Sequence, residues 1–263
     1  MNQFFIDPSA VEGNRITVTG DNVNHIANVL RLRKGESVQL VEQLSGLTYY
    51  ADIVSIEPDS VVCEIQDVQS ESREMPVAVT IYQGMPKSDK LEFVIQKAVE
   101  LGAVRIVPVN MKRSVVKIDQ SRIAKKCVRW NAIAESAASQ SKRSVIPEVL
   151  APMSFEDAIA DAGKCEAILL PYELASATVS EKDGGSGAPL SDMDRTRSIL
   201  NELRLSDVKS IGVFIGPEGG FDITEVDRAC EAGAHIITLG NRILRTETAP
   251  IAILSWITYL FEN

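Results

Sequence analysis

The stretch Ile211–Asp222, IGVFIGPEGGFD, decides the fold of the C-terminal part of the chain. A β-rich apolar run ends in the glycine turn 216–220, and Asp222 and Glu225 then form the pattern of a capping box that opens a helix. Glycines at such a turn permit positive φ angles and let a ligand approach the backbone, while the helix N-terminus offers unpaired N–H groups. The pattern predicts either a ligand-binding turn or a tight turn in which the glycines are needed only for the backbone conformation.

The alternation of strand and helix extends over the whole C-terminal part. From residue 77 onward, β-rich runs alternate with helical patterns, which predicts an α/β domain with a mainly parallel sheet. The polar run 176–192 has the composition of a flexible surface loop. The expected strands are 77–82, 104–109, 167–170, 210–215 and 235–239, and the expected helices are 88–101, 120–139, 222–232 and 250–261.

A second strand-to-helix connection, Leu239–Ala249 (LGNRILRTETA), is dense in polar groups. Arg242 or Arg245 could bind a phosphate or a developing oxyanion, or the threonines could simply cap the apolar helix that follows. Neither glycine-bearing connection has the GxGxxG or GxxxxGK[ST] spacing, which removes the main support for nicotinamide and P-loop nucleotide sites.

The first seventy residues have a different pattern. Short β-rich runs at 16–18, 38–41, 49–56 and 61–65 are separated by turn signals, and one helix is expected at 21–32. This pattern predicts a small barrel-like β domain over residues 1–70. The polar segment 71–76 is the expected linker, and residues 76–263 form the second domain.

Composition excludes several classes of protein. The chain has 263 residues, 45% hydrophobic and 24% charged, which is typical of a folded protein with a full core. No run approaches the roughly 20 apolar residues of a membrane span, and the opening MNQFFID does not resemble a secretory signal. Four cysteines without a CxxC pair and only two histidines disfavour disulfides and a metal centre. We therefore expect a cytoplasmic protein that binds neither metal nor membrane.

The charge is unevenly distributed. The net charge is −9, yet ten basic residues and only two acidic ones lie between Arg105 and Arg143. A cluster of cations on an acidic protein is compatible with a surface that contacts nucleic-acid phosphates, or with an ordinary solvated helix face.

Several segments together resemble the RsmE group of the SPOUT RNA methyltransferases. They are NHIANVLRLRKGE (24–36), QGMPKSDKLEFVIQKAVELGA (83–103), RSVVK (113–117), WNAIAESAASQSKR (130–143), IGPEGGF (215–221) and LGNRILRTETA (239–249). The resemblance implies a PUA-like β-barrel followed by an α/β domain with a deep trefoil knot. It also implies a homodimer that methylates N3 of a uridine in 16S ribosomal RNA of the small ribosomal subunit, with S-adenosyl-L-methionine as the cofactor.

The resemblance also implies a cofactor site and an RNA surface. The expected cofactor-binding residues surround the two glycine-bearing connections and the end of one earlier strand: Leu170, Pro171, Ile215, Gly216, Pro217, Gly220, Leu239, Gly240, Ile243, Leu244 and Thr246. The expected RNA-binding residues are Arg31, Arg33, Lys112, Arg113, Lys117, Lys125, Arg129 and Lys142.

For catalysis, the uracil imide must lose a proton. A carboxylate, either Glu218 or Glu247, is the expected general base that accepts this proton. Arg245 or Arg143 could stabilise negative charge on the uracil carbonyls. Two alternatives stay open: an RNA-binding or ribosome-assembly protein of the same fold without catalysis, and a SPOUT methyltransferase that acts on a different nucleotide.

Overall fold

The computed structural model describes residues 1–263 except 71, 117–118, 174–190 and 263. It divides into two compact units, which we call the N-terminal unit (residues 1–74 with 135–146) and the sheet unit (residues 75–134 with 147–263). These units differ from the expected domains mainly in that residues 135–146 join the N-terminal unit. Most of the expected surface loop lies outside the described residues.

The N-terminal unit contains a six-stranded sheet in the order β1-β4-β5-β6-β3-β2. Neighbouring strands are antiparallel, except that β1 pairs in parallel with β4. The four expected strands are all present, whereas β1 and β2 were not predicted. The elements are β1 (Asn2–Ile6), β2 (Val11–Glu12), β3 (Arg15–Thr19), α1 (Asp21–Asn24) with a π-helical continuation (His25–Val29), β4 (Ser37–Glu42), β5 (Thr48–Ile56) and β6 (Ser60–Gln69).

The sheet unit contains a seven-stranded sheet in which every pair of neighbours is parallel, as the alternating pattern predicts. The order is β10-β8-β7-β12-β11-β13, and β9 also pairs with β8. The strands are β7 (Ala78–Gly84), β8 (Arg105–Asn110), β9 (Glu148–Val149), β10 (Met153–Ser154), β11 (Ala167–Pro171), β12 (Ser210–Ile215) and β13 (His235–Ile237). The helices are α2 (Lys90–Glu100), α3 (Gln120–Gln140), α4 (Phe155–Ala162), α6 (Asp192–Leu205), α7 (Ile223–Glu231) and α8 (Ala249–Phe261).

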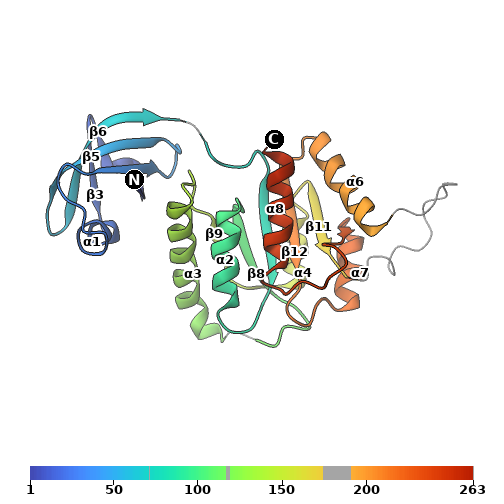
Figure 1. The fold of residues 1–263 in the computed structure, drawn as a ribbon. Coiled ribbons are helices and arrows are strands. Elements are labelled where there is room, and N and C mark those ends of the chain that lie inside the picture. The colour runs from blue at the N-terminus through green and yellow to red at the C-terminus, as the bar shows by residue number, and fades with distance from the viewer. Residues whose placement is uncertain (71, 117–118, 174–190, 263) are drawn as a thin grey trace. The chain divides into compact units, whose positions relative to one another are not determined.

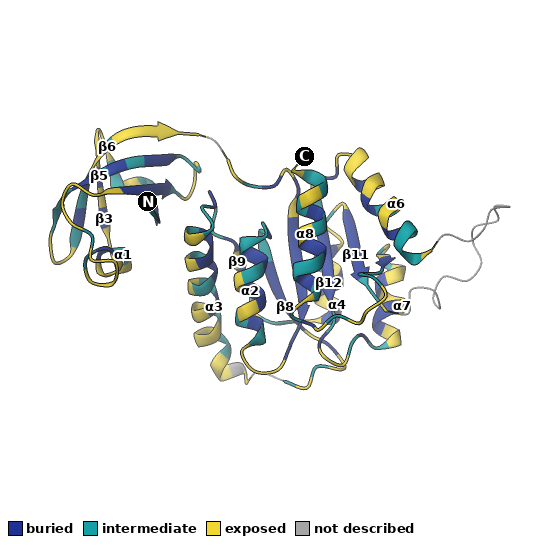
Figure 2. Cartoon of the chain, viewed as in Figure 1, coloured by how far each residue is buried: buried dark blue, intermediate teal, exposed yellow. Residues whose placement is uncertain are grey.

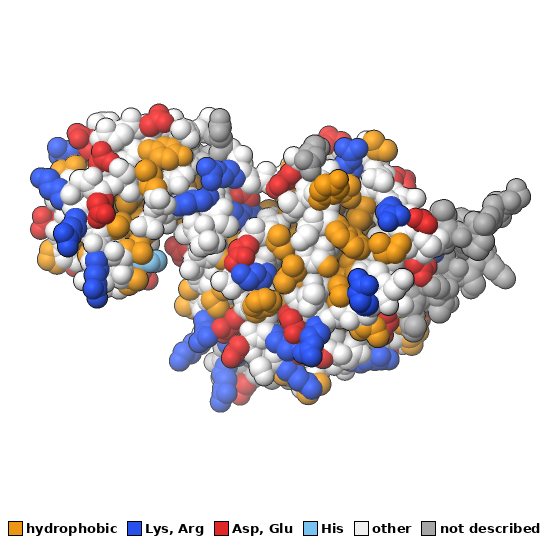
Figure 3. All heavy atoms as spheres, in the orientation of Figure 1, with side chains coloured by type: hydrophobic (Ala, Val, Ile, Leu, Met, Phe, Trp, Pro, Cys, Tyr) orange, Lys and Arg blue, Asp and Glu red, His pale blue; other side chains and the backbone are white. Residues whose placement is uncertain are grey.

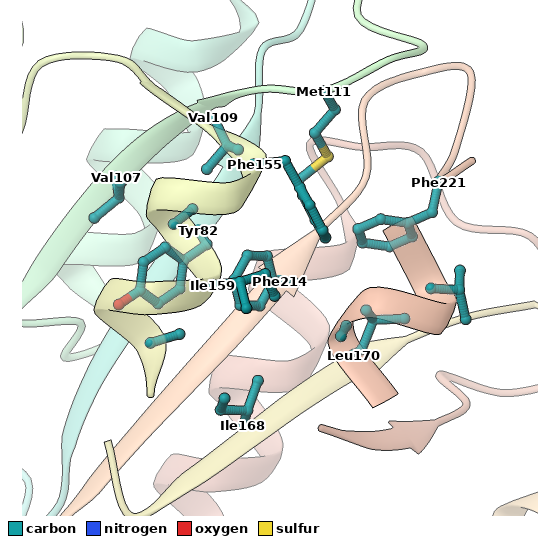
Figure 4. Close-up of a cluster of buried hydrophobic side chains, with 14 of the residues drawn as sticks. Tyr82, Val107, Val109, Met111, Phe155, Ile159, Ile168, Leu170, Phe214 and Phe221 are labelled. Atoms are coloured by element: carbon teal, nitrogen blue, oxygen red, sulfur yellow. The ribbon is translucent and has the colours of Figure 1, made fainter. Parts of the chain in front are cut away.

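Helices cover both faces of this sheet (Figure 1). On one face α8 contacts both α2 and α6. On the other face, apolar side chains of α4 and α7 pack with alternate strand residues in one buried cluster, which includes Tyr82, Phe155 and Phe214 (Figure 4). The central strands β7, β8, β11 and β12 are mostly buried, as expected for a parallel sheet between two helical layers (Figure 2).

The ends of two helices test the capping predictions. Asp222 and Glu225 form the predicted capping box of α7, and Gly233 follows that helix with a φ of 86°. Serine is a common N-cap residue, so Ser88 is expected to cap the helix predicted over 88–101. That expectation is wrong: α2 begins at Lys90, and Ser88 has a φ of 54°. The backbone therefore turns sharply just before α2.

Two further observations concern the whole described chain. Among the residues that the structure describes, no helix combines the length and the apolar character that a membrane crossing requires. The same residues contain no group of three or more His, Cys, Asp or Glu side chains that could hold a metal ion. The knot implied by the family resemblance stays a prediction.

Candidate active site

The candidate site lies at the carboxyl edge of the parallel sheet. Strands β7, β12, β11 and β13 are consecutive neighbours in that sheet, so the segments that follow them emerge at the same edge. Ligands of open α/β sheets bind outside the carboxyl ends of the strands. The segments 216–222 and 238–248, which carry most of the expected site residues, both start there.

Gly84 brings the end of β7 against the turn after β12. A Cβ atom on Gly84 would lie 2.6 Å from both the backbone nitrogen and the Cδ of Pro217, and 2.8 Å from the Sδ of Met111. These distances are shorter than van der Waals contact, so only glycine fits. The turn 216–220 is thus held directly over the end of β7.

We expect Gly84→Ala to lower the free energy of unfolding by about 1–3 kcal/mol, because the added methyl group meets backbone atoms that cannot rotate away. Urea denaturation measures the change. Gly163→Ala is the matched control, since a Cβ there would meet its nearest atom at 3.4 Å. Equal effects of the two substitutions would contradict the steric explanation.

The two glycine-bearing segments meet, and the contact is made by Thr246. The Oγ1 of Thr246 donates a hydrogen bond to the carbonyl oxygen of Gly216 (2.7 Å) and accepts one from Nε2 of Gln83 (2.9 Å). Gln83 is fully buried and Thr246 is 6% exposed. A buried chain of polar contacts therefore connects β7, the turn after β12 and the segment after β13.

Open space remains beside the same turns. Gly220 and Gly240 have φ angles of 68° and 106°, and a Cβ on either would meet no atom within 4 Å. The Oε1 atom of Gln83 is buried and has no hydrogen-bond partner among the described residues. The site therefore offers accessible backbone at two glycines, and the buried Oε1 of Gln83 is an unsatisfied acceptor among the described residues.

The two candidate carboxylates share a cation. Lys90 Nζ lies 3.2 Å from Oε1 of Glu218 and 3.1 Å from Oε2 of Glu247. Glu218 also accepts a hydrogen bond from the backbone N–H of Lys87 (3.0 Å). The structure thus places Glu218 and Glu247 on either side of the first residue of α2.

These contacts lower the pKa values of the two glutamates, Glu218 and Glu247. Burial raises the pKa of Glu218, but the N–H groups of Lys87 and Glu218 and the ammonium of Lys90 outweigh it and hold that pKa below its usual value. Burial likewise raises the pKa of Glu247. The backbone N–H of Glu247 and the positive charges of Lys90 and Arg245 have the opposite, larger effect, so this pKa is also below its usual value. Both side chains are ionised at neutral pH and are weak proton acceptors.

The remaining expected cofactor residues differ in exposure. Leu170 and Ile215 are buried strand ends, and the Leu170 side chain belongs to the apolar cluster beside α4 and α7, so a ligand would reach its backbone only. Pro171, Leu239 and Leu244 are partly exposed, whereas Ile243 is 81% exposed. Pro217 is buried against Gly84.

Several expected RNA-binding residues lie near this edge. Arg113 donates a hydrogen bond to the carbonyl oxygen of Gly219 (3.4 Å), and the backbone N–H of Lys112 donates to Glu225 (2.7 Å). Both basic side chains are more than half exposed. On α3, Lys125 and Arg129 are exposed. Figure 3 shows Lys and Arg side chains, mixed with acidic ones, along the lower border of the sheet unit in that view.

Other expected residues lie in the N-terminal unit or outside the described chain. Arg31 and Arg33 are exposed. Lys142 donates a hydrogen bond to the carbonyl oxygen of Met1 (2.6 Å), and burial together with Arg73 lowers its pKa. The ammonium of Lys142 therefore has a hydrogen-bond partner within the N-terminal unit. Lys117 is not among the residues that the structure describes.

Arg143, which the sequence suggests as a group that stabilises charge, lies in a buried ion pair, and its catalytic role stays a prediction. This residue is 4% exposed, and its guanidinium pairs with Glu74. Its carbonyl oxygen accepts a hydrogen bond from Gln3 (2.7 Å), and the next N–H, of Ser144, donates to Glu74 (2.9 Å). These contacts hold Arg143 in place within the N-terminal unit.

Two site residues were not predicted, namely Lys90 and Gln83. Gln83 carried a weak signal, since a polar residue occupies a buried register position near the carboxyl end of an apolar strand. Nothing in the local sequence indicated a role for Lys90, because its partners, Glu218 and Glu247, lie far away in the sequence.

Comparisons with known proteins identify the class to which this chain belongs. A family model described as RNA methyltransferase domain matches residues 73–258, and one described as RNA methyltransferase PUA domain matches residues 18–66. These matches define the class: an RNA methyltransferase with an N-terminal PUA domain and a C-terminal α/β domain of the SPOUT type, as expected from the sequence.

Similarity to individual proteins identifies the family within this class. Ribosomal RNA small subunit methyltransferase E of Bacillus subtilis (strain 168) is 36% identical, over 100% of this chain and 98% of that protein. Its counterpart in Mesomycoplasma hyopneumoniae (strain 232) is 31% identical, over 97% and 98%. A crystal structure of ribosomal RNA small subunit methyltransferase E from Neisseria gonorrhoeae bound to S-adenosyl methionine has a TM-score of 0.78 and 30% identity, over 99% and 98%. The chain belongs to the ribosomal RNA small subunit methyltransferase E family.

Proposed function

We propose that the protein transfers a methyl group from S-adenosyl-L-methionine to N3 of a uridine in 16S ribosomal RNA, in the cytoplasm. The observation that carries this proposal is the contact of Thr246 with Gly216, because it joins the two glycine-bearing segments into one site at the carboxyl edge of the sheet. Family membership supports the reaction and the substrate class.

The residues at this edge fit the cofactor. Open space beside Gly220 and Gly240 allows a ligand to reach the backbone, and Gln83 offers a buried acceptor that lacks a partner. S-adenosyl-L-methionine carries amino groups that can donate to such acceptors, and its sulfonium supplies the methyl group. Backbone groups of residues 215–217, 220, 239–240 and 243–244 would hold it, with Thr246 beneath and the strand end 170–171 alongside.

The described side chains suggest how the imide is activated. Arg245 is exposed at the edge of the site, where a guanidinium would stabilise negative charge on a uracil carbonyl. Glu218 and Glu247 are ionised, so either is able to take the proton, but their lowered pKa values make them weak bases. Charge stabilisation by Arg245 therefore carries more of the activation in this proposal.

The decisive experiment is mass spectrometry of nucleosides from 16S ribosomal RNA incubated with the protein and isotopically labelled S-adenosyl-L-methionine. The proposal expects label in 3-methyluridine. Label in another nucleoside would favour the second candidate, a methyltransferase with a different target. Cofactor binding by calorimetry separates these outcomes from a non-catalytic RNA-binding protein, which would bind RNA and no cofactor.

We expect Lys112→Glu and Arg113→Glu each to weaken binding to 16S ribosomal RNA and to reduce the salt dependence of affinity by about one unit of logarithmic slope, because each phosphate contact releases counterions. Lys209→Glu is the matched control: Lys209 is 59% exposed but precedes β12 at the opposite, amino edge of the sheet. Titration at several salt concentrations measures the slopes. Equal effects at both edges would refute a local RNA surface.

We also propose a homodimer that forms through α8 and α2. Helix α8 has no charged residue, yet only part of it is buried: Tyr259 is 74% exposed, and Phe93 of α2 is 44% exposed. In Figure 3 hydrophobic side chains gather over these helices. An exposed apolar surface of this kind is typical of an interface between subunits.

The dimer proposal predicts that Tyr259→Glu shifts the protein to a monomer, because an unpaired carboxylate would become buried in the interface. Analytical ultracentrifugation measures the mass. Leu205→Glu is the control, since Leu205 is similarly exposed (78%) on α6. A monomeric parent protein, or a dimer that tolerates Tyr259→Glu, would disprove this interface.

A further inference from the structure

Lys90 contacts two acidic side chains that come from different segments. Glu218 lies in the turn after β12 and Glu247 in the segment after β13, and both are within 3.2 Å of the Lys90 ammonium. The three side chains are 31%, 25% and 19% exposed, so solvent screens them only in part. One cation thereby bridges the two segments that form the proposed cofactor site.

The other lysine of α2 has only a local partner. Lys97 pairs with Glu100 at 2.8 Å, one helical turn away, and is 32% exposed. That pair stays within α2 and connects no other segment. The two lysines lie on the same helix and have nearly the same exposure, but among the described residues only Lys90 pairs with acidic side chains of other segments.

Glu218 makes a second contact with the start of α2. The N-cap residue, Asp89, forms no side-chain capping hydrogen bond. Instead, Glu218 accepts from the backbone N–H of Lys87 (3.0 Å), which directs its negative charge toward the positive end of the helix. The turn after β12 is thus attached to α2 by an ion pair and a hydrogen bond.

We propose that Lys90 is a positioning residue of the methyltransferase site, which fastens the turn 216–220 to the segment 239–248 through Glu218 and Glu247. The inference rests on the proposed function, since it assigns Lys90 to the geometry of the cofactor site. Without the ammonium, two carboxylates would face each other and repel, and the segments that carry them would separate.

The first test measures the two segments in the absence of cofactor. Hydrogen–deuterium exchange of the Lys90→Met protein is expected to be about tenfold faster at residues 216–220 and 239–248, a change typical of breaking a coupled ionic network. Lys97→Met is the matched control and is expected to leave exchange in these segments unchanged. Lys90→Arg retains the charge and is expected to restore most of the protection.

The second test measures cofactor affinity as a function of pH. At about pH 8, Lys90→Met is expected to weaken binding of S-adenosyl-L-methionine about tenfold, because both carboxylates are charged and repel. The charged groups that act on them are Lys90 and, for Glu247, also Arg245. Removing Lys90 raises both pKa values, so the variant's carboxylates take up protons at a higher pH than those of the parent protein. As the pH is lowered toward about 5.5, the repulsion therefore decreases and affinity partly recovers. The parent protein is expected to show no such recovery.

Two results would overturn the positioning role. One is a Lys90→Met protein with parental exchange and parental affinity. The other is a loss of affinity that stays constant from pH 5.5 to pH 8, because packing of the aliphatic stem would then explain it. If no variant and no parent protein binds S-adenosyl-L-methionine, the proposed function fails, while the exchange experiment still decides whether Lys90 fastens the two segments.

Discussion

Replacing Arg245 with methionine is expected to lower the rate of methyl transfer by about 10²–10³-fold, the usual cost of removing one group that stabilises charge in a transition state. Methionine keeps the length of the side chain and removes the guanidinium. Because the proposed role arises only as negative charge builds on the uracil, the affinity for S-adenosyl-L-methionine should change little. Single-turnover assays measure the rate, and calorimetry measures the affinity.

Arg242→Met is the matched control for that experiment. Arg242 is a second exposed arginine in the same segment, and its substitution would remove an equal charge from the same edge of the sheet. If both variants lose the same activity, the arginines act through general attraction of RNA. A rate loss confined to Arg245→Met would support a role at the reacting base.

The second large effect is expected from Phe214→Ala. Phe214 is fully buried in β12, stacks on Tyr82 with ring centroids 4.6 Å apart and contacts Phe155 at 5.6 Å. Removing a buried aromatic ring costs the transfer free energy of the lost atoms and leaves a cavity, about 3–5 kcal/mol in total. Urea denaturation measures this loss in the free energy of unfolding.

Phe214→Leu separates the two contributions, since leucine fills part of the cavity and should lose less than half as much stability as alanine. Because β12 leads directly into the turn 216–220, the alanine variant should also bind cofactor less tightly. A decrease in stability below about 1 kcal/mol would show that the ring contributes little to the core.

The sequence predicted most of the regular structure of the sheet unit. Its five longer strands are apolar runs, and glycines such as Gly233 follow helix ends; these signals act over a few neighbouring residues. The two-residue strands β9 and β10 and the helices α4 and α6 were not predicted. In the N-terminal unit, β1 was missed because its pairing with β4 depends on residues far along the chain. The role of Lys90 was not predicted for the same reason, since both of its acidic partners are distant in the sequence.

Charge patterns were the least informative signal. The basic residues between Arg105 and Arg143 form one cluster in the sequence but have different surroundings in the structure. Arg105 pairs with Asp161 at 2.5 Å, beside the hydroxyl of Tyr82, and Arg143 pairs with Glu74. A linear count of charges cannot show which cations already have partners, so the burial of Arg143 and its pairing with Glu74 could not be predicted from the sequence.

The close approach of Gly84 to Pro217 limits how this enzyme could be redesigned. A methyl group at Gly84 would strike main-chain atoms, so no repacking of neighbouring side chains makes room for it. A library aimed at a new nucleotide preference should hold this position constant and vary exposed residues such as Arg242 and Ile243 instead.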